Sequence, residues 1–439
     1  MILMNDFQRQ WQETAPDFRR ALDRTGASGW YILGREVERF EQNLAAAWGL
    51  PHAAGVASGL DALEIALRIL GLRPGGRVLV APVSAFATAL AVLRAGGVPV
   101  FAPCAPNGLV DLDACIRILE QDASIRFFLP VHLYGHCLDL EKLDSIAALG
   151  VRIVEDCAQS ILARFHGRPC GSAGSAAATS FYPTKNLGAM GDGGALLTRD
   201  ADLDAQARCW RDYGQKGKYN HVVTGLNSRL DELQAAFLSD AGLPRLPAWT
   251  ARRRSIARSY IGGIRHPQIE IPPPPPGSES VWHLFPVLVP DGAKESFRNH
   301  MTACGVQTAE HYPLPMFDQP ALREARYEIA GDPSPARLFC RREVSLPIHP
   351  YLHDEEVEAV IRACNSWPGA WHDGPEPRPA ADSVSQRTRR QRPGSAPRTK
   401  GASRPEAGIP PAPAGPEGGC GRAAARPDPL ASPTRPAIS

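Results

Sequence analysis

One stretch, residues 151–194, constrains the fold of this chain more than any other. It holds VRIVE, a short apolar and β-branched run typical of a buried parallel strand, and AAATSFY, a second small and apolar run. The first run leads to Asp156, and the second breaks at Pro183 and leads to Lys185 in a glycine-rich loop. Because ligands of open α/β sheets bind at the carboxyl ends of strands, we expect Asp156 and Lys185 to meet at one sheet edge.

A carboxylate and a lysine at one edge are what pyridoxal phosphate requires of its protein. The carboxylate keeps the pyridine nitrogen protonated, and the lysine carries the cofactor as a Schiff base and moves protons. Taken singly, a loop lysine is usually a solvated charge, and an Asp after a strand is usually a turn or helix cap. The ordered set favours the cofactor: Asp156, Gln159, Ser180, Lys185, Gly188, Gly191, Gly193 and Gly194.

EDCAQS followed by SFYPTKNLGAMGDGGALLT closely resembles the DegT/DnrJ/EryC1/StrS family of sugar aminotransferases, over about residues 1–365. The resemblance implies the aspartate aminotransferase (type I) fold: a large α/β domain with a mostly parallel central sheet, and a small α+β C-terminal domain. We predict an N-terminal segment and large cofactor-binding domain over 1–250, and the small domain over 251–365. Residues 366–439 are rich in Pro, Arg, Ala and Gly, and we predict a disordered tail.

Charge and composition exclude several classes of protein. The net charge of the 439 residues is +2, and a surplus of basic residues after residue 372 leaves the rest slightly acidic. Nothing global therefore favours nucleic acid, and no apolar run is long enough for a signal core or a membrane span. The ten cysteines are scattered without zinc spacing, so we predict no metal site. Cysteines in apolar surroundings, such as Cys104, Cys115, Cys157 and Cys304, suit reduced core thiols and a cytoplasmic protein.

A Ser-Gly turn at 58–59 precedes a predicted helix. Such a pair is usually just a cap, but a helix N-terminus also attracts an anion through its free N–H groups and its dipole. The resemblance implies that this turn belongs to the family's phosphate cup. The cup residues are Ser58, Gly59, Leu60 and Ser180. Many family members carry Thr where this chain has Leu60, so the cup lacks one hydroxyl.

The resemblance also gives roles to residues around the cofactor ring. Lys185 is the catalytic residue, which forms the Schiff base and shuttles a proton. Asp156 holds the pyridinium proton, and Gln159 supports the ring oxygen. Phe86 is the local aromatic candidate for stacking on the ring. Core packing of Phe86, or a register that places Ala85 at the stacking position, are the alternatives.

The loop before residue 227 is basic and aromatic, and in the resembled family it reaches the neighbouring subunit's active site. The resemblance implies that Asn227 binds the cofactor phosphate in trans, and that Lys218 and Tyr219 contact the nucleotide diphosphate of the substrate. The alternative is an ordinary solvated loop. A helix is expected to begin near Asn227, with Leu230 on its apolar face.

The small domain is expected to contribute a turn, HYP, to the same site. His311 and Tyr312 of this turn are the expected substrate contacts. Many relatives have a second histidine where this chain has Phe317, so one sugar-side contact is missing. Sites shared between subunits imply an obligate homodimer.

The expected function is transfer of an amino group from an amino acid, glutamate, to a keto group of a nucleotide-activated deoxysugar. The SGLDAL and GKYNH…GLNSRLDELQAA segments favour C3 of a dTDP-linked keto-6-deoxyhexose, with C4 as the alternative. A sugar dehydratase using pyridoxamine phosphate is a further alternative, against which Lys185 argues, because those relatives carry histidine there. The last alternative function is that of a non-catalytic regulatory or scaffolding dimer.

Overall fold

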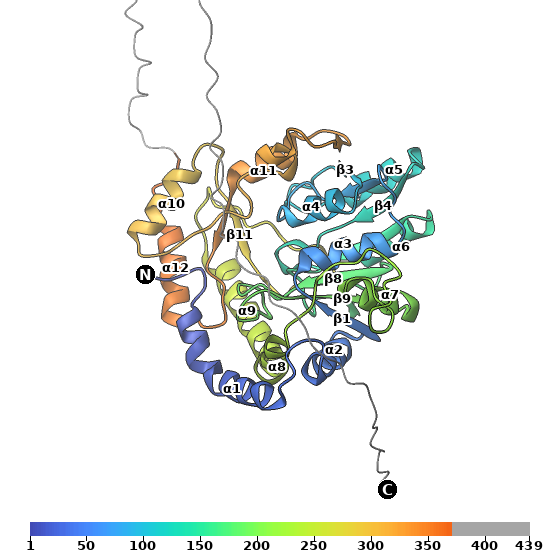
Figure 1. The fold of residues 1–439 in the computed structure, drawn as a ribbon. Coiled ribbons are helices and arrows are strands. Elements are labelled where there is room, and N and C mark those ends of the chain that lie inside the picture. The colour runs from blue at the N-terminus through green and yellow to red at the C-terminus, as the bar shows by residue number, and fades with distance from the viewer. Residues whose placement is uncertain (371–439) are drawn as a thin grey trace, which may run out of the picture. The chain divides into compact units, whose positions relative to one another are not determined.

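The central sheet has eight strands within residues 1–370, which are the residues that the computed structural model describes (Figure 1). Its strand order is β1-β9-β8-β5-β4-β2-β3-β12. The bounds are β1 His52–Val56, β9 Gly194–Thr198, β8 Ala176–Ser180, β5 Arg152–Asp156, β4 Ile125–Leu129, β2 Arg77–Val80, β3 Val98–Phe101 and β12 Glu328–Ile329. All neighbours from β8 to β12 pair in parallel, and β9 pairs antiparallel with both β8 and β1. The predicted α/β fold with a mostly parallel sheet is confirmed.

Helices connect and cover these strands. Their bounds are α1 Phe7–Ser28, α2 Arg35–Trp48, α3 Gly59–Ile69, α4 Ala87–Arg94, α5 Leu112–Gln121, α6 Leu140–Ala148, α7 Ala201–Arg211, α8 Glu232–Phe237, α9 Leu243–Gly263, α10 Lys294–Ala303, α11 Ser334–Arg342 and α12 Asp354–Asn365. The remaining short strands are β6 Arg164–Phe165, β7 Arg168–Pro169, β10 Ser278–Glu279, β11 Phe285–Leu288 and β13 Glu343–Leu346. Helix α3 packs over β5, β8 and β9, which brings its N-terminus to the sheet edge where Asp156 and Ser180 lie.

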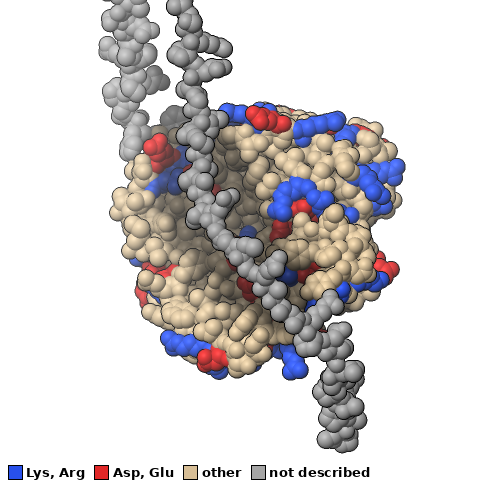
Figure 2. Space-filling model, in the orientation of Figure 1, with Lys and Arg blue, Asp and Glu red and all other residues tan. Residues whose placement is uncertain are grey.

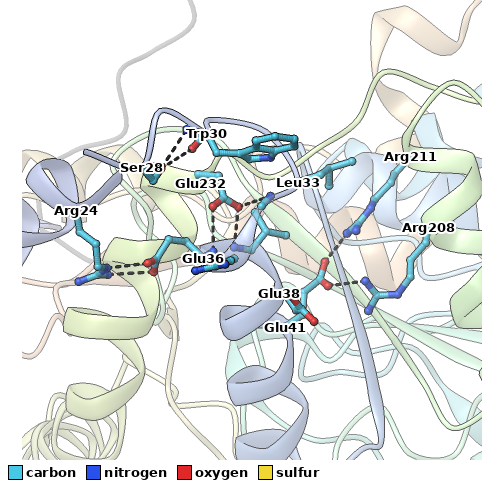
Figure 3. Close-up of a pocket in the computed structure, with 13 residues that line it drawn as sticks. Arg24, Ser28, Trp30, Leu33, Glu36, Glu38, Glu41, Arg208, Arg211 and Glu232 are labelled. Atoms are coloured by element: carbon cyan, nitrogen blue, oxygen red, sulfur yellow. Dashed lines mark hydrogen bonds and ion pairs between the residues drawn. The ribbon is translucent and has the colours of Figure 1, made fainter. Parts of the chain in front are cut away.

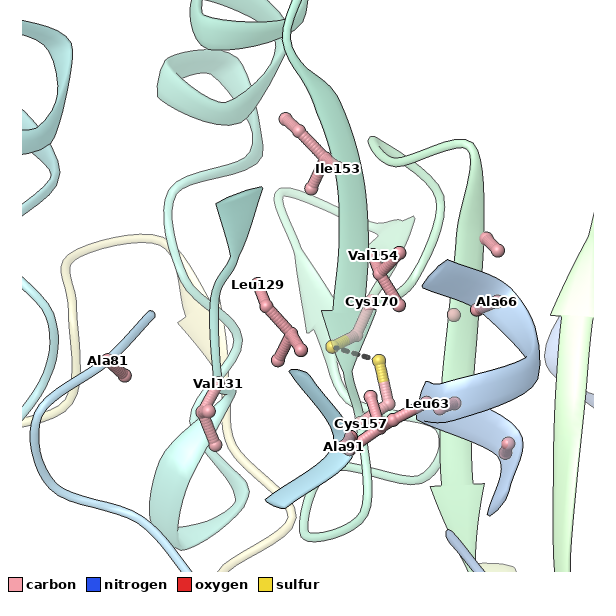
Figure 4. Packing of buried hydrophobic residues seen from close by; sticks show 14 of the residues in the cluster. Leu63, Ala66, Ala81, Ala91, Leu129, Val131, Ile153, Val154, Cys157 and Cys170 are labelled. Atoms are coloured by element: carbon pink, nitrogen blue, oxygen red, sulfur yellow. Dashed lines mark hydrogen bonds between the residues drawn. The ribbon is translucent and has the colours of Figure 1, made fainter. Parts of the chain in front are cut away.

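The strand that ends at Asp156 is buried because its neighbours are apolar on both sides. Figure 4 shows Ile153 and Val154 of β5 beside Leu129 of β4, with Leu63 and Ala66 of α3 facing them. Four of the five residues of β5 are buried, and only Arg152 is exposed. This continuous apolar pattern is typical of a parallel strand covered on both faces.

A second hydrophobic core lies beside the first. It is built from α9, α10, α12 and the antiparallel pair β11–β13, and it includes Tyr260, Phe285 and Phe297. The predicted boundary at 250/251 falls within α9, whose residue Leu246 packs into the first core and whose Ile256 packs into the second. The predicted domain boundaries stay predictions.

Two segments qualify those boundaries. Strand β12 extends the large sheet, and Phe317 and Phe339 pack into the first core, although all three fall within the predicted small domain. Trp367 is buried in the second core, so residues 366–370 are placed with the body. From residue 371 onward, the predicted tail lies outside the described residues.

The expected helix near Asn227 begins later. Asn227 pairs with Asp212 in an isolated β-bridge, and the backbone N–H of Ser228 donates to the Arg211 carbonyl at 2.9 Å. Since these backbone groups are bonded to the end of α7, the chain stays extended until α8 begins at Glu232. The apolar periodicity identified the helix and placed its start about one turn too early.

The surface shown in Figure 2 mixes charges of both signs, with Lys and Arg interspersed among Asp and Glu. Within residues 1–370, no helix combines the length and the hydrophobicity that crossing a bilayer requires. Among the cysteines predicted to be core thiols, Cys104, Cys115 and Cys157 are buried, but Cys304 is exposed at the end of α10. The prediction for Cys304 is therefore wrong, because its helix presents that end to solvent.

Candidate active site

Asp156 and Lys185 are brought together at the carboxyl edge of the sheet. Asp156 is the last residue of β5, and Lys185 follows β8, which pairs in parallel with β5. The two charges influence each other: Lys185 opposes the rise in the pKa of Asp156, and Asp156 opposes the fall in the pKa of Lys185. The meeting of an acid and a lysine at one edge, expected from the sequence, is thus present.

The Asp156 carboxyl is held from two sides. Its Oδ1 accepts a hydrogen bond from the Ala158 backbone N–H at 3.1 Å, and its Oδ2 accepts one from the Thr88 hydroxyl at 3.0 Å. Thr88 in turn lies 2.9 Å from the Ser84 hydroxyl. Burial raises the pKa of Asp156, and these two bonds oppose that rise. Thr88 was not identified from the sequence, because its contact with Asp156 spans 68 residues.

The amine of Lys185 sits where its charged form is poorly solvated. Burial lowers its pKa from the usual range to about 8, although Asp156 favours the ammonium form. An amine with this pKa is neutral in about a tenth of molecules at pH 7 and in about half at pH 8. Lysines that act as nucleophiles or bases commonly have such a lowered pKa.

The N-terminus of α3 forms a tight cradle beside these two residues. Ser58 is the N-cap, and its Oγ accepts a hydrogen bond from the Asp61 N–H at 3.1 Å. The next two N–H groups, of Gly59 and Leu60, belong to those that an α-helix leaves unpaired at its start. A Cβ on Gly59 would lie 2.8 Å from the Ser180 Cβ, so only glycine permits this approach.

The side chain of Gln159 links the sheet edge to the predicted HYP turn. Its Oε1 accepts from the Tyr134 backbone N–H at 2.7 Å, and its Nε2 donates to the Tyr312 hydroxyl at 3.1 Å. The Tyr134 hydroxyl donates to the His311 carbonyl at 2.5 Å. The structure therefore brings Gln159, His311 and Tyr312 into one hydrogen-bonded group next to Asp156.

Other predicted residues lie apart from this group. Lys218 and Tyr219 lie on an exposed loop, with the Lys218 amine 5.2 Å from the Tyr219 ring centre, and Asn227 is also exposed. Within residues 1–370, no hydrogen bond joins them to the Lys185 group. Leu60 and Phe86 are half-buried against the first core, which is the core-packing alternative for Phe86.

A buried cluster behind Asp156 is already satisfied without a ligand. His132 Nδ1 accepts from the Leu138 N–H at 3.0 Å, so its Nε2–H donates to Glu155 at 2.8 Å. Cys157 and Cys170 lie beside this pair with sulfurs 3.6 Å apart (Figure 4). A histidine that binds metal normally donates its other N–H. His132 accepts there, which fits a core histidine and not a metal ligand.

A further cavity within residues 1–370 lies elsewhere. It measures about 860 Å³ and is lined by the segment around Trp30 and by α2 and α7 (Figure 3). Several of its charges are satisfied within the chain: Glu41 contacts Arg208 and Arg211, and Glu232 accepts from three backbone N–H groups of 34–37. This cavity is a surface pocket whose walls are joined by ion pairs and hydrogen bonds, and neither Lys185 nor Asp156 lines it.

Comparisons with known proteins agree with this geometry. The model of the DegT/DnrJ/EryC1/StrS aminotransferase family matches residues 12–365, so the chain belongs to that family. It is 41% identical over 366 residues to the dTDP-3-amino-3,4,6-trideoxy-alpha-D-glucose transaminase of Streptomyces venezuelae, covering 82% of this chain and 95% of that protein. It is 40% identical to the dTDP-3-amino-3,6-dideoxy-alpha-D-galactopyranose transaminase of Aneurinibacillus thermoaerophilus, covering 84% and 99%.

A solved structure supports the same family and fold. The crystal structure of S. venezuelae DesV in complex with a ketimine intermediate matches with a TM-score of 0.79 and 40% identity, covering 83% of this chain and 98% of that one. The chain is therefore an aminotransferase with the type I fold, and its cofactor is pyridoxal 5′-phosphate. The residues present fit this group: its aldehyde would meet a lysine with a lowered pKa, its ring nitrogen a buried carboxyl, and its phosphate a helix N-terminus.

Uptake of pyridoxal phosphate by the apoprotein should follow the titration of Lys185. The neutral amine is the reactive form, and its pKa is about 8. The uptake rate should therefore rise ~50-fold between pH 6 and 8, and less than about twofold between pH 8 and 9. Stopped-flow absorbance measures this rate. The rate with n-butylamine in place of protein, divided by the neutral fraction of that amine at each pH, corrects for titration of the free cofactor. A corrected gain of about tenfold between pH 8 and 9 would contradict the lowered pKa.

Proposed function

We propose that the protein transfers an amino group from glutamate to the C3 keto group of a dTDP-linked keto-6-deoxysugar. The observation that carries this proposal is Lys185, with its lowered pKa, beside the buried carboxyl of Asp156. The choice of C3 is supported by the relatives from S. venezuelae and A. thermoaerophilus, both named for 3-amino sugar nucleotides.

The chain's own residues divide the work at the cofactor. Pyridoxal phosphate, when bound, supplies the electron sink for the reaction. Lys185 holds the cofactor, and its Nζ takes up and returns a proton, for which a pKa near 8 is well matched to neutral pH. Asp156 keeps the ring nitrogen protonated, and Thr88 and the Ala158 N–H fix its orientation. Gln159 supports the ring oxygen.

The phosphate is held at the start of α3. The N–H groups of Gly59 and Leu60 would bind it, and the helix dipole would add a favourable field. Ser58 and Ser180 complete the cup on this chain. Phe86 remains the candidate for contact with the cofactor ring, because its side chain is only partly buried against the first core.

The active site is completed by a second copy of the chain. Asn227, Lys218 and Tyr219 are exposed and are not bonded to the Lys185 group within residues 1–370. Trp30 and Tyr31 are also exposed, at 62% and 60%, although aromatic side chains are normally covered. We infer a homodimer in which the partner's Asn227 reaches the phosphate, and the partner's Lys218 and Tyr219 meet the nucleotide diphosphate.

His311 and Tyr312 face the sugar side of the site. Burial lowers the pKa of His311 to about 4, with a further contribution from Lys185, so its ring is neutral at working pH. Its Nδ1 lies 2.9 Å from the Ser345 hydroxyl, which fixes the ring. A neutral, oriented imidazole and a tyrosine hydroxyl are suited to hydrogen bonds with sugar hydroxyls. Within residues 1–370 the cysteines form no disulfide, which fits the cytoplasm, where we place the protein.

A direct assay tests this function against its alternatives. The holoenzyme is incubated with glutamate and with matched dTDP-linked 3-keto and 4-keto 6-deoxysugars, and the products are identified by mass spectrometry and NMR. We expect amination of the 3-keto sugars. Amination of the 4-keto sugars alone would replace C3 by C4. Loss of water from the sugar without amination would indicate a dehydratase, and no reaction with a fully loaded holoenzyme would support a regulatory dimer.

A further inference from the structure

One buried arginine near the lysine has no carboxylate partner. Arg253, on α9, is only 5% exposed. Its Nη1 touches the carbonyls of Trp282, His283 and Ile348 at 3.2–3.3 Å, which are long hydrogen bonds, and its Nε has no partner. Within residues 1–370 it forms no ion pair. A buried charge without a counter-charge is costly, which indicates that its partner is not part of the chain.

The neighbouring arginines show that Arg253 is the exception. Arg252 donates to the Asp354 carboxylate at 2.7 Å, and Arg254 donates to the Ser280 carbonyl at 2.8 Å near the surface. Arg253 instead lies on the buried face of α9, in register with Ile256 and Tyr260. The helix therefore aims one of three successive guanidinium groups inward.

Arg253 lines two adjoining cavities, one of which is also lined by Lys185. One is a narrow cleft shared with Asn5, Thr184 and Lys185. The other measures about 110 Å³ and is shared with Thr184 and His311. The acid that lines the narrow cleft, Asp6, is committed to capping α1 and to Arg9.

A second buried polar side chain, that of His349, lines both cavities. His349 is 4% exposed, and neither of its ring nitrogens forms a hydrogen bond. Burial, together with the charge of Arg253, lowers its pKa to about 4, so the ring is neutral and can donate one hydrogen bond. The cavities thus offer a fixed positive charge and a free N–H donor, both aimed at the same small space.

We propose that Arg253 and His349 bind a carboxylate of the amino-acid donor. This inference rests on the proposed function, since it assigns a place to the donor within the same site. A guanidinium fork matches a carboxylate geometrically and forms strong charge-assisted hydrogen bonds with it. A cavity of about 110 Å³ is much smaller than the ~300–1,000 Å³ pockets that hold larger ligands, so it suits a small group such as a carboxylate and not a whole nucleotide sugar. The shared lining with Lys185 places the donor's reacting carbon beside the amine.

Measuring the two half-reactions separately shows whether Arg253 binds the donor or only stabilises the fold. Wild-type holoenzyme, Arg253→Gln and Arg253→Lys are mixed with rising L-glutamate, and the loss of the bound cofactor's visible absorbance is followed in single turnovers. Arg253→Gln should raise the glutamate concentration for half-maximal rate about 10–100-fold. Arg253→Lys keeps the charge without the fork, and it should raise this concentration less, by about 3–10-fold. Arg252→Gln is the matched control and should stay within about twofold, because its ion pair is exposed.

The acceptor half-reaction supplies the contrast. Enzyme loaded with pyridoxamine phosphate is mixed with the keto sugar, and both Arg253 variants should react within a few-fold of wild type. Equal losses in both half-reactions, or an unchanged glutamate dependence, would overturn the assignment. If Arg253→Gln does not fold, the donor and acceptor half-reactions are compared with Arg253→Lys alone.

Binding of an unreactive dianion tests the site independently of turnover. Glutarate should raise the Tm of wild-type holoenzyme and raise that of Arg253→Lys much less. Equal shifts in both proteins would overturn the proposal. If wild-type holoenzyme responds to no amino acid, the proposed function fails, whereas the glutarate comparison still decides whether Arg253 binds carboxylate.

Discussion

Replacing Lys185 with alanine should reduce transamination by at least about 10³-fold, because the variant loses both the group that holds the cofactor and the proton carrier. The fold should survive this change. Within residues 1–370, the Lys185 side chain forms no hydrogen bond or ion pair, and its charge is poorly solvated. We expect a Tm within a few degrees of wild type and an unchanged oligomeric state.

The matched control is Lys142→Ala, which removes an exposed lysine paired with Asp113 on α5. It should retain wild-type turnover, since exposed ion pairs contribute little. Coupled detection of 2-oxoglutarate release measures the rate in both variants. Turnover of the Lys185 variant within tenfold of the wild type would contradict a catalytic role for Lys185.

Mixing two inactive variants should restore activity if each site is shared between subunits. Lys185→Ala lacks the amine, and under the proposed shared site Asn227→Asp would place a carboxylate against the partner's cofactor phosphate. A mixed dimer has one site that carries both lesions and one site that carries neither. Equal mixing should therefore recover about a quarter of wild-type activity, since half of the dimers are mixed and each has one intact site.

A second mixture makes this test specific. Asp156→Asn and Lys185→Ala alter residues that meet within one chain at the ends of β5 and β8. Each site of a mixed dimer then carries one lesion, so this pair should recover nothing. Recovery in the second mixture, or none in the first with subunit exchange confirmed by differently tagged chains, would contradict the shared site.

The sequence located the parts of this site that depend on local patterns. The apolar run of β5 and the break after β8 placed Asp156 and Lys185 at strand ends, and parallel pairing then brings them to one edge. The Ser-Gly turn likewise identified the start of α3, where Ser58 acts as the N-cap. Such signals can be read because the chemistry and the geometry lie within a few residues of each other.

Contacts between distant segments could not be predicted in this way. Thr88 looks like any small helical residue until folding places it against Asp156, and the role of Glu155 emerges only from its bonds to His132 and to the backbone around Gly171. The delayed start of α8 has the same origin, because α7 captures the backbone at Ser228. Arg253 is intermediate: its spacing to Ile256 and Tyr260 marks a buried face, and only the structure shows the missing partner.

The central claim is that Lys185 holds the cofactor at this sheet edge. Borohydride reduction of the yellow holoenzyme, followed by proteolysis and mass spectrometry, identifies the lysine that becomes permanently labelled. The account predicts a phosphopyridoxyl group on the peptide that contains Lys185, with the visible absorbance lost on reduction. Labelling of a different lysine, or a fully loaded enzyme that yields no labelled peptide, would contradict it.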